Sequence, residues 1–189
     1  MGKEIAGKPN HSSLPDRSEL REKVIESIAN TMDLYGVNHT FGKLYGVMYF
    51  EDRAMTLEEM KTSMNMSKSN MSYAVRSLTE SQMIYKLEEK KERQDQYVAE
   101  TDFYRTFQNF FGIKLQREVD VMLESIRDVI PDLTAIILSE HTHAQEREEA
   151  LRDLHKLQHA EQYYIWLQGF VDRLREGKLY EEASSLLEE

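Results

Sequence analysis

The chain has 189 residues, of which 40% are hydrophobic and 31% are charged, and its formal net charge is −10. This length accommodates one compact domain with a helical extension rather than two full domains. No segment approaches the roughly 18–20 consecutive apolar residues of a membrane-spanning helix, the first residues lack the apolar core of a secretory signal, and cysteine is absent. We therefore expect a cytoplasmic protein without disulfides, thiolate chemistry or membrane contact.

The acidic charge is concentrated in the C-terminal third of the chain. Residues 139–189 contain six basic and twelve acidic residues, whereas residues 54–99 contain seven of each kind. Affinity for nucleic acid depends on where the basic groups are placed, and the net charge of the whole chain does not decide it. The neutral middle segment is therefore compatible with binding to DNA.

Two helical patterns follow a polar N-terminal segment. Residues 1–17 contain two of the three prolines, and we interpret them as a flexible arm. From Ser18 onward apolar residues recur in steps of three and four, which predicts an amphipathic helix that ends near Gly36. The same spacing continues from Phe41 to Met48 and predicts a second helix.

The segment from Thr56 to Leu78 has the pattern of a helix-turn-helix. Thr56 and Glu59 have the spacing of a capping box, in which an N-cap threonine and the glutamate three residues later bind each other's backbone N–H groups. Ser67 is placed to cap a second short helix after a connection of three or four residues. The order of capped helix, short turn and capped helix predicts a DNA-binding motif.

Two strand-like segments come directly after the second helix of this motif. Residues 84–88 and 96–99 have strand composition and flank a charged tip at 89–95. A β-hairpin in this position is a wing. We therefore expect residues 18–100 to form a winged helix-turn-helix domain.

The rest of the chain, residues 101–189, has a helical pattern. Pro131 is expected to interrupt the first of these helices, and a last long helix is predicted from about Glu140. Its apolar residues between Leu157 and Leu174 repeat in steps of three and four, which is enough for a helical hairpin or a dimer seam. The predicted fold is mainly α with a small β-wing, and long flanking helices are expected to form a homodimer.

The predicted second helix of the motif has an outer face of the residue types that bind DNA. Serine and lysine reach phosphates, asparagine can pair bidentately with adenine, and arginine can pair bidentately with guanine. The candidates on this helix are Ser67, Lys68, Ser69, Asn70, Ser72, Tyr73 and Arg76. At the wing tip, Lys90, Lys91 and Arg93 are expected to contact phosphates with little reading of sequence. The alternative is that both surfaces are merely solvated, and the ordered arrangement of cap, turn, helix and wing favours DNA binding.

Four ordered blocks of sequence resemble the GbsR-type branch of the MarR-like repressors. They are MDLYG (32–36), GKLYGVMYF (42–50), MTLEEM (55–60) and MSKSNMS (66–72). The resemblance covers about residues 20–125, and the C-terminal third matches only in helical character and length. It implies a winged-helix homodimer that binds operator DNA and represses genes for the uptake or synthesis of compatible solutes. Wings of this family often have a basic turn with glycine, whereas residues 90–93 here are KKER.

The resemblance also implies a small ligand, because some members of the family sense choline or glycine betaine. A quaternary ammonium is held by several aromatic rings, each within about 6 Å of the cation. The candidates for such a cage are Tyr35, Tyr45, Tyr49, Tyr104, Phe107 and Phe111. The alternative for each ring is a place in an ordinary aromatic core.

Other functions find less support in the sequence. His155 and His159 are four residues apart, a spacing that can hold a metal, but they lie in a charge-rich segment without an evident third ligand, so we expect no metal site. No glycine-rich phosphate loop or nucleophile elbow is present, so we expect neither an enzyme nor a cofactor. The leading alternative is a winged-helix adaptor that binds other proteins and has no sequence-specific contact with DNA.

Overall fold

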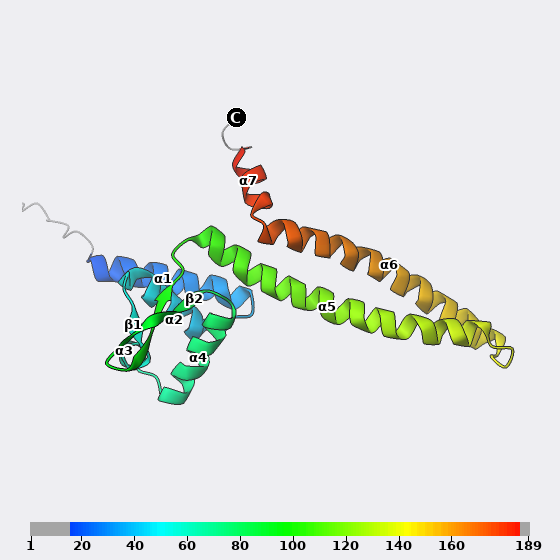
Figure 1. The fold of residues 1–189 in the computed structure, drawn as a ribbon, viewed down its shortest axis with the longest axis horizontal. Helices are drawn as coiled ribbons and strands as arrows, with labels where there is room; N and C mark the ends of the chain where they lie inside the picture. Colours follow the sequence, from blue (N-terminus) through cyan, green and yellow to red (C-terminus); the bar gives the residue numbers. More distant parts are fainter. Residues whose placement is uncertain (1–15, 186–189) are drawn as a thin grey trace, which may run out of the picture. The chain divides into compact units, whose positions relative to one another are not determined.

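The computed structural model describes residues 16–185, which form two compact units (Figure 1). One unit contains the residues up to Arg76 together with Lys86–Ala99, and the other contains Ser77–Tyr85 and the residues from Glu100 onward. The expected N-terminal arm lies almost entirely outside the described residues. The described elements are mainly helices with a small antiparallel sheet, so the predicted fold class is confirmed.

The first unit has the elements of a winged helix. Its helices are α1 (Arg17–Leu34), α2 (His39–Glu51), α3 (Leu57–Met64) and the greater part of α4 (Lys68–Glu80). Three strands form a sheet in the order β1–β3–β2, and they are β1 (Met55–Thr56), β2 (Ile84–Lys91) and β3 (Gln94–Ala99). In the antiparallel pair of β1 with β3, Met55 lies opposite Tyr97. β1 was not predicted because two residues are too few to show an alternating pattern.

The end of α1 and its packing against α2 both depend on glycine. Gly36 has a φ of 75°. Its N–H donates to the Asp33 carbonyl at 2.9 Å, while the Val37 N–H donates to the Met32 carbonyl at 3.0 Å. This is a Schellman ending, and it confirms the predicted end of the helix. A Cβ added at Gly42 of α2 would lie 2.8 Å from the Ala29 Cα, so a larger residue there would push the two helices apart.

The helix-turn-helix has the predicted caps. Thr56 and Glu59 form a complete capping box at the start of α3. The helix ends at Asn65, which has a φ of 50°, and the Ser67 hydroxyl accepts the Asn70 backbone N–H at 3.2 Å at the start of α4. One face of α4 is buried and consists of Met71, Ala74, Val75 and Leu78. The cap and turn predictions are confirmed.

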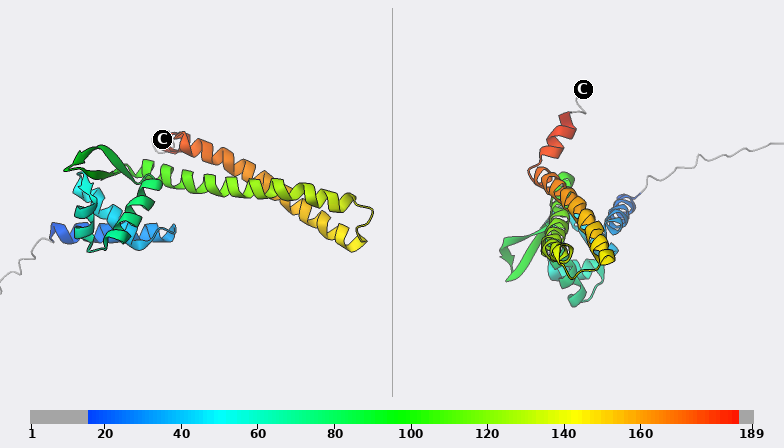
Figure 2. Two further views of the ribbon diagram at one scale, coloured as in Figure 1. Left: turned by 60° about the horizontal axis from the view of Figure 1, so that its bottom comes forward. Right: turned by 90° about the vertical axis from the view of Figure 1, so that its right-hand side faces the viewer.

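The hairpin of β2 and β3 is longer than predicted and its turn is tighter (Figure 2). The expected charged tip at 89–95 is wrong, because only Glu92 and Arg93 lie between the strands. Both have positive φ, 50° and 68°, as the tight two-residue hairpin turn of type I′ requires. Charged residues give no alternating apolar signal, so the sequence pattern could not show that the strands continue through them. The turn adopts this geometry without the glycine that usually occupies it.

The second unit is a helical hairpin followed by a short helix. It contains α5 (Phe103–Leu138), α6 (Ala144–Arg175) and α7 (Lys178–Ser185). α5 and α6 lie side by side in antiparallel directions (Figures 1 and 2). A buried cluster of Val119, Leu123 and Leu167 joins them. The apolar stripe of α6 was expected to serve a helical hairpin or a dimer seam. Within the chain it forms the helical hairpin.

Pro131 does not interrupt α5, and this prediction was wrong. A proline removes one backbone donor and crowds the preceding turn, which usually breaks or kinks a helix. Here it is exposed, and α5 continues beyond it to Leu138. Packing along the rest of a 36-residue helix outweighs the loss of one backbone hydrogen bond.

Candidate nucleic-acid interface

The start of α4 presents polar side chains to solvent. The residues from Ser67 to Asn70 are exposed, as are Tyr73 and Arg76, whereas Ser72 is half-buried. Among the described residues, neither Lys68 nor Arg76 forms an ion pair. These side chains are therefore available to an outside partner.

Tyr73 is 64% exposed, yet its ring has a neighbour. It meets Phe41 of α2 edge to face, with ring centroids 5.5 Å apart. A hollow of about 480 Å³ lies beside this pair and is lined by Asn38, Thr40, Phe41, Asn65, Met66, Ser67, Asn70 and Tyr73. The contact with Phe41 limits the positions open to the Tyr73 ring on the outer face of α4.

The wing differs from α4 because most of its cations have carboxylate partners. On β2, Lys86 and Lys90 lie 2.7 Å and 3.4 Å from the carboxylate of Asp95 on β3. Lys91 lies 3.1 Å from a carboxylate oxygen of Glu59. Arg93, in the turn, forms no ion pair with any residue that the structure describes. Of the three predicted wing contacts, only Arg93 is ready to meet a phosphate without giving up an ion pair.

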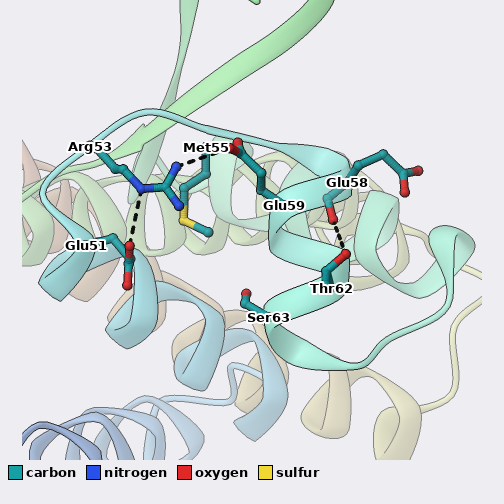
Figure 3. Close-up of a pocket in the computed structure, with 7 residues that line it drawn as sticks. All are labelled: Glu51, Arg53, Met55, Glu58, Glu59, Thr62 and Ser63. Atoms are coloured by element: carbon teal, nitrogen blue, oxygen red, sulfur yellow. Dashed lines mark hydrogen bonds and ion pairs between the residues drawn. The ribbon is translucent and has the colours of Figure 1, made fainter. Parts of the chain in front are cut away.

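Glu59 is the acceptor for groups from three parts of the first unit, and Figure 3 shows the contact with one of them, Arg53. Its Oε2 accepts the Thr56 backbone N–H at 2.7 Å, and its Oε1 accepts Lys91 at 3.1 Å and Arg53 at 3.3 Å. The hydrogen bond from the Thr56 backbone, followed by that from Lys91, lowers the pKa of Glu59 from 4.5 to about 2. Arg53 also binds Glu51 at 3.3 Å, so the guanidinium bridges two carboxylates.

The residues of the predicted aromatic cage belong to different units. In the first unit, Tyr45 is 1% exposed and lies in the core, with its ring 6.3 Å from that of Tyr49, while Tyr35 is exposed. In the second unit, Tyr104 is 62% exposed and its ring centroid lies 4.2 Å from that of Tyr180.

The other two candidates for the cage, Phe107 and Phe111, also belong to the second unit. Their ring centroids lie 4.6 Å apart. Phe107 is about half exposed.

Residues 16–185 contain neither a candidate metal cluster nor a candidate membrane span. In that range no group of three or more histidine, cysteine, aspartate or glutamate residues is arranged to hold a metal ion. His155 and His159 are exposed on α6. No helix in the same range is long and apolar enough to cross a membrane.

The winged helix with an exposed second motif helix defines a DNA-binding protein of the helix-turn-helix class. Residues 103–181 match the family described as "GbsR family transcriptional regulator, C-terminal helical hairpin". The chain is 37% identical over 162 residues to the HTH-type transcriptional repressor GbsR of Bacillus subtilis, covering 86% of this chain and 89% of the relative. It therefore belongs to the GbsR family of transcriptional regulators, which are not enzymes.

Two further likenesses agree with this assignment. The chain is 28% identical over 151 residues to the HTH-type transcriptional repressor OpcR of Bacillus subtilis, covering 80% of this chain and 82% of the relative. A solved structure described as "Crystal Structure of a transcriptional regulator" matches with a TM-score of 0.52 and 14% identity, covering 82% of this chain and 98% of that one. At this identity the second likeness supports the fold alone.

Sequence reasoning missed the wider role of Glu59. The capping box singled out Glu59 as a partner of Thr56, and this contact is present. Its contact with Lys91 joins residues 32 positions apart. Only the antiparallel pairing of the strands brings those two positions together, and no local pattern reports it.

Proposed function

We propose that this protein represses transcription by binding operator DNA as a homodimer in the cytoplasm. In this proposal α4 enters the major groove, with Asn70 and Arg76 on base edges and Lys68 and the serines on phosphates. The observation that supports it best is the outer face of α4, where two cations lie exposed and without ion pairs on an ordered helix. The printed names of the two Bacillus subtilis relatives, both repressors, support the direction of regulation.

The second copy in the dimer is proposed to bind the helical unit and α1. Large apolar side chains of α6 are exposed, among them Tyr163, Ile165 and Trp166, and α1 exposes Leu20 and Val24. Groups of exposed apolar residues mark interaction surfaces. A two-fold dimer would present two α4 helices to successive turns of DNA, as palindromic operators require.

The proposed targets are genes for the uptake or synthesis of compatible solutes, with choline or glycine betaine as the signal. The resemblance of the four sequence blocks supports this choice. Tyr104 and Phe107 of the second unit are each more than half exposed, so a cation can reach them without disrupting a core. By linkage, such a ligand weakens operator binding only to the extent that it prefers the state that does not bind DNA.

Selection of bound duplexes from random DNA tests this function directly. We expect the full chain to enrich a palindromic sequence and to bind it as a dimer in sedimentation experiments. Adding millimolar choline or glycine betaine should weaken that binding. Failure to enrich any sequence would favour the adaptor alternative, and an unchanged affinity with both compounds would remove them as signals.

Calorimetry then tests the aromatic site itself. Replacing Tyr104 by alanine should weaken ligand binding about tenfold, because one cation–π contact in a desolvated site contributes up to about 2 kcal/mol. Tyr104→Phe keeps the ring and should have a milder effect. An alanine variant that binds ligand like the native chain would exclude Tyr104 from the site.

A further inference from the structure

The ion pair between Glu59 and Lys91 joins the wing to the helix-turn-helix. Lys91 is the last residue of β2, next to the hairpin turn, and Glu59 lies in the first turn of α3. In the sheet order β1–β3–β2, the strand that holds Lys91 is not adjacent to the strand that leads into α3. The contact therefore joins β2 to α3, in addition to the hydrogen bonds that join the strands to one another.

Two groups other than Lys91 also hold the carboxylate of Glu59. The Thr56 backbone N–H binds one of its oxygens at 2.7 Å, and Arg53 binds the other at 3.3 Å (Figure 3). A carboxylate held in this way keeps its charge and direction. Lys91 is 54% exposed and Glu59 is 30% exposed, so the pair lies at the surface where a phosphate could compete for the ammonium group.

We propose that Glu59 is a positioning residue that holds Lys91 away from DNA phosphates and so limits the sequence-independent affinity of the protein for DNA. This inference rests on the proposed DNA-binding function. Nonspecific affinity comes from cations that neutralise phosphates, and it is equal for every sequence. A lysine that must first leave a carboxylate contributes less to this affinity, and the vacated carboxylate then repels the nearby phosphates. Base contacts from α4 are unaffected, so the affinities for the operator and for other DNA are lowered by a similar factor.

The test compares Glu59→Gln with Glu58→Gln. Both substitutions remove one negative charge from the first turn of α3, and both leave an amide oxygen in place. Glu58 hydrogen-bonds to Lys61 on its own helix and lies near the charge of Lys68 on α4, and among the described residues it has no contact with the wing. The control therefore frees cations of α3 and α4 and none of the wing, whereas Glu59→Gln frees Lys91 and Arg53, and the effect on the total charge is the same.

Binding to a random-sequence duplex is measured for each variant across a range of salt concentrations. Glu59→Gln should bind this duplex about two- to fivefold more tightly than the native chain at low salt, the range that one exposed ion pair covers. Its salt slope should steepen by about 0.9 for each additional phosphate contact. Operator affinity should rise by a similar factor, because a phosphate contact does not depend on sequence. An equal gain in Glu58→Gln would overturn the proposal.

A double variant separates positioning from a general effect on structure. If Glu59 acts through Lys91, then adding Lys91→Ala to Glu59→Gln should abolish most of the gain, and a gain that persists would contradict the mechanism. If Glu59→Gln does not fold, the proposal is tested with the two single variants Lys91→Ala and Arg93→Ala. Lys91→Ala should then weaken random-duplex binding less than Arg93→Ala, and an equal loss would overturn the proposal. A native chain that binds no duplex at low salt would instead refute the proposed function.

Discussion

The two units of the chain differ in how they use polar and apolar side chains. In the winged-helix unit, Lys68 and Arg76 lie exposed on α4 without ion pairs among the described residues. In the hairpin unit, Gln116 and Gln168 exchange two hydrogen bonds, at 2.7 Å and 3.0 Å, between α5 and α6. That unit exposes rings instead, and Trp166 is 62% accessible.

This difference separates the two kinds of contact that a dimeric regulator needs. An unpaired cation on an ordered helix is ready for a phosphate or a base edge, because it has no internal partner to leave. An exposed aromatic ring gains most from another apolar surface. Each unit can therefore be altered without directly damaging the contacts of the other, and substitutions can test that separation.

The largest expected effect is on the stability of the hairpin. Leu167 is 5% exposed in the cluster with Val119 and Leu123, and a buried Leu→Ala change costs about 2–5 kcal/mol. Urea unfolding followed by tryptophan fluorescence measures the loss, since Trp166 is the one tryptophan of the chain and lies on α6. Leu138→Ala makes the same change at an exposed position at the end of α5, so it is the control and should cost less than about 0.5 kcal/mol. Equal losses would mean that the hairpin core lies elsewhere.

Substitutions on α4 should weaken operator binding and leave the hairpin intact. Asn70→Ala or Arg76→Ala should cost about 1–3 kcal/mol at the selected operator, and much less on random DNA. Fluorescence anisotropy with both duplexes measures this ratio. Arg127→Ala on α5 removes an exposed cation outside the winged helix and should leave it unchanged. Operator affinity that survives both α4 changes would exclude these residues from base recognition.

A smaller effect is expected within the wing itself. Arg93 forms no ion pair among the described residues, whereas Lys90 shares Asp95 with Lys86. Arg93→Ala should flatten the salt dependence of binding by about 0.9, the value for one phosphate contact. Lys90→Ala should flatten it less, because Asp95 already neutralises much of that charge. If both slopes change equally, the ion pairs of the wing do not restrain its contacts with DNA.

The sequence predicted the elements whose signals are local. The capping residues Thr56 and Ser67 and the terminator Gly36 each act within three or four residues of the chain. Apolar spacing likewise predicted the buried face of α4. Such features depend on backbone geometry over one or two turns, so a single sequence is sufficient to find them.

The features that the sequence did not predict depend on contacts between distant residues. The strands of the wing continue through charged residues because β2 and β3 pair with each other, and the Lys86–Asp95 ion pair joins them. Helix α5 continues through Pro131 because its other residues remain packed. Three donors from three segments meet at the carboxylate of Glu59. Each of these features depends on contacts between residues that are far apart in the sequence, and the local spacing of residue types does not show such contacts.

The last expected effect concerns pH and the winged-helix unit alone. The Thr56 backbone hydrogen bond and Lys91 lower the pKa of Glu59 from 4.5 to about 2 in the folded state. Between these two values the unfolded chain binds more protons at this residue than the folded chain, so stability rises with pH across the window. The contribution is fully present above about pH 4.5, and it is lost as the pH falls toward 2.

Glu59→Gln removes this contribution, so the native chain should exceed the variant in stability by more at pH 6 than at pH 3. Urea unfolding followed by circular dichroism at both values measures the two differences. Glu89→Gln serves as the control, since Glu89 is an exposed wing carboxylate without an ion pair among the described residues. Its difference from the native chain should be nearly the same at both pH values. If the Glu59→Gln difference also stays constant, the carboxylate charge of Glu59 does not hold the wing to α3, and the neutral capping hydrogen bond is sufficient. In that case the ion pair of Lys91 would not distinguish it from Arg93. The main difference between the two units would then be the face of α4, where Lys68 and Arg76 form no ion pair among the described residues.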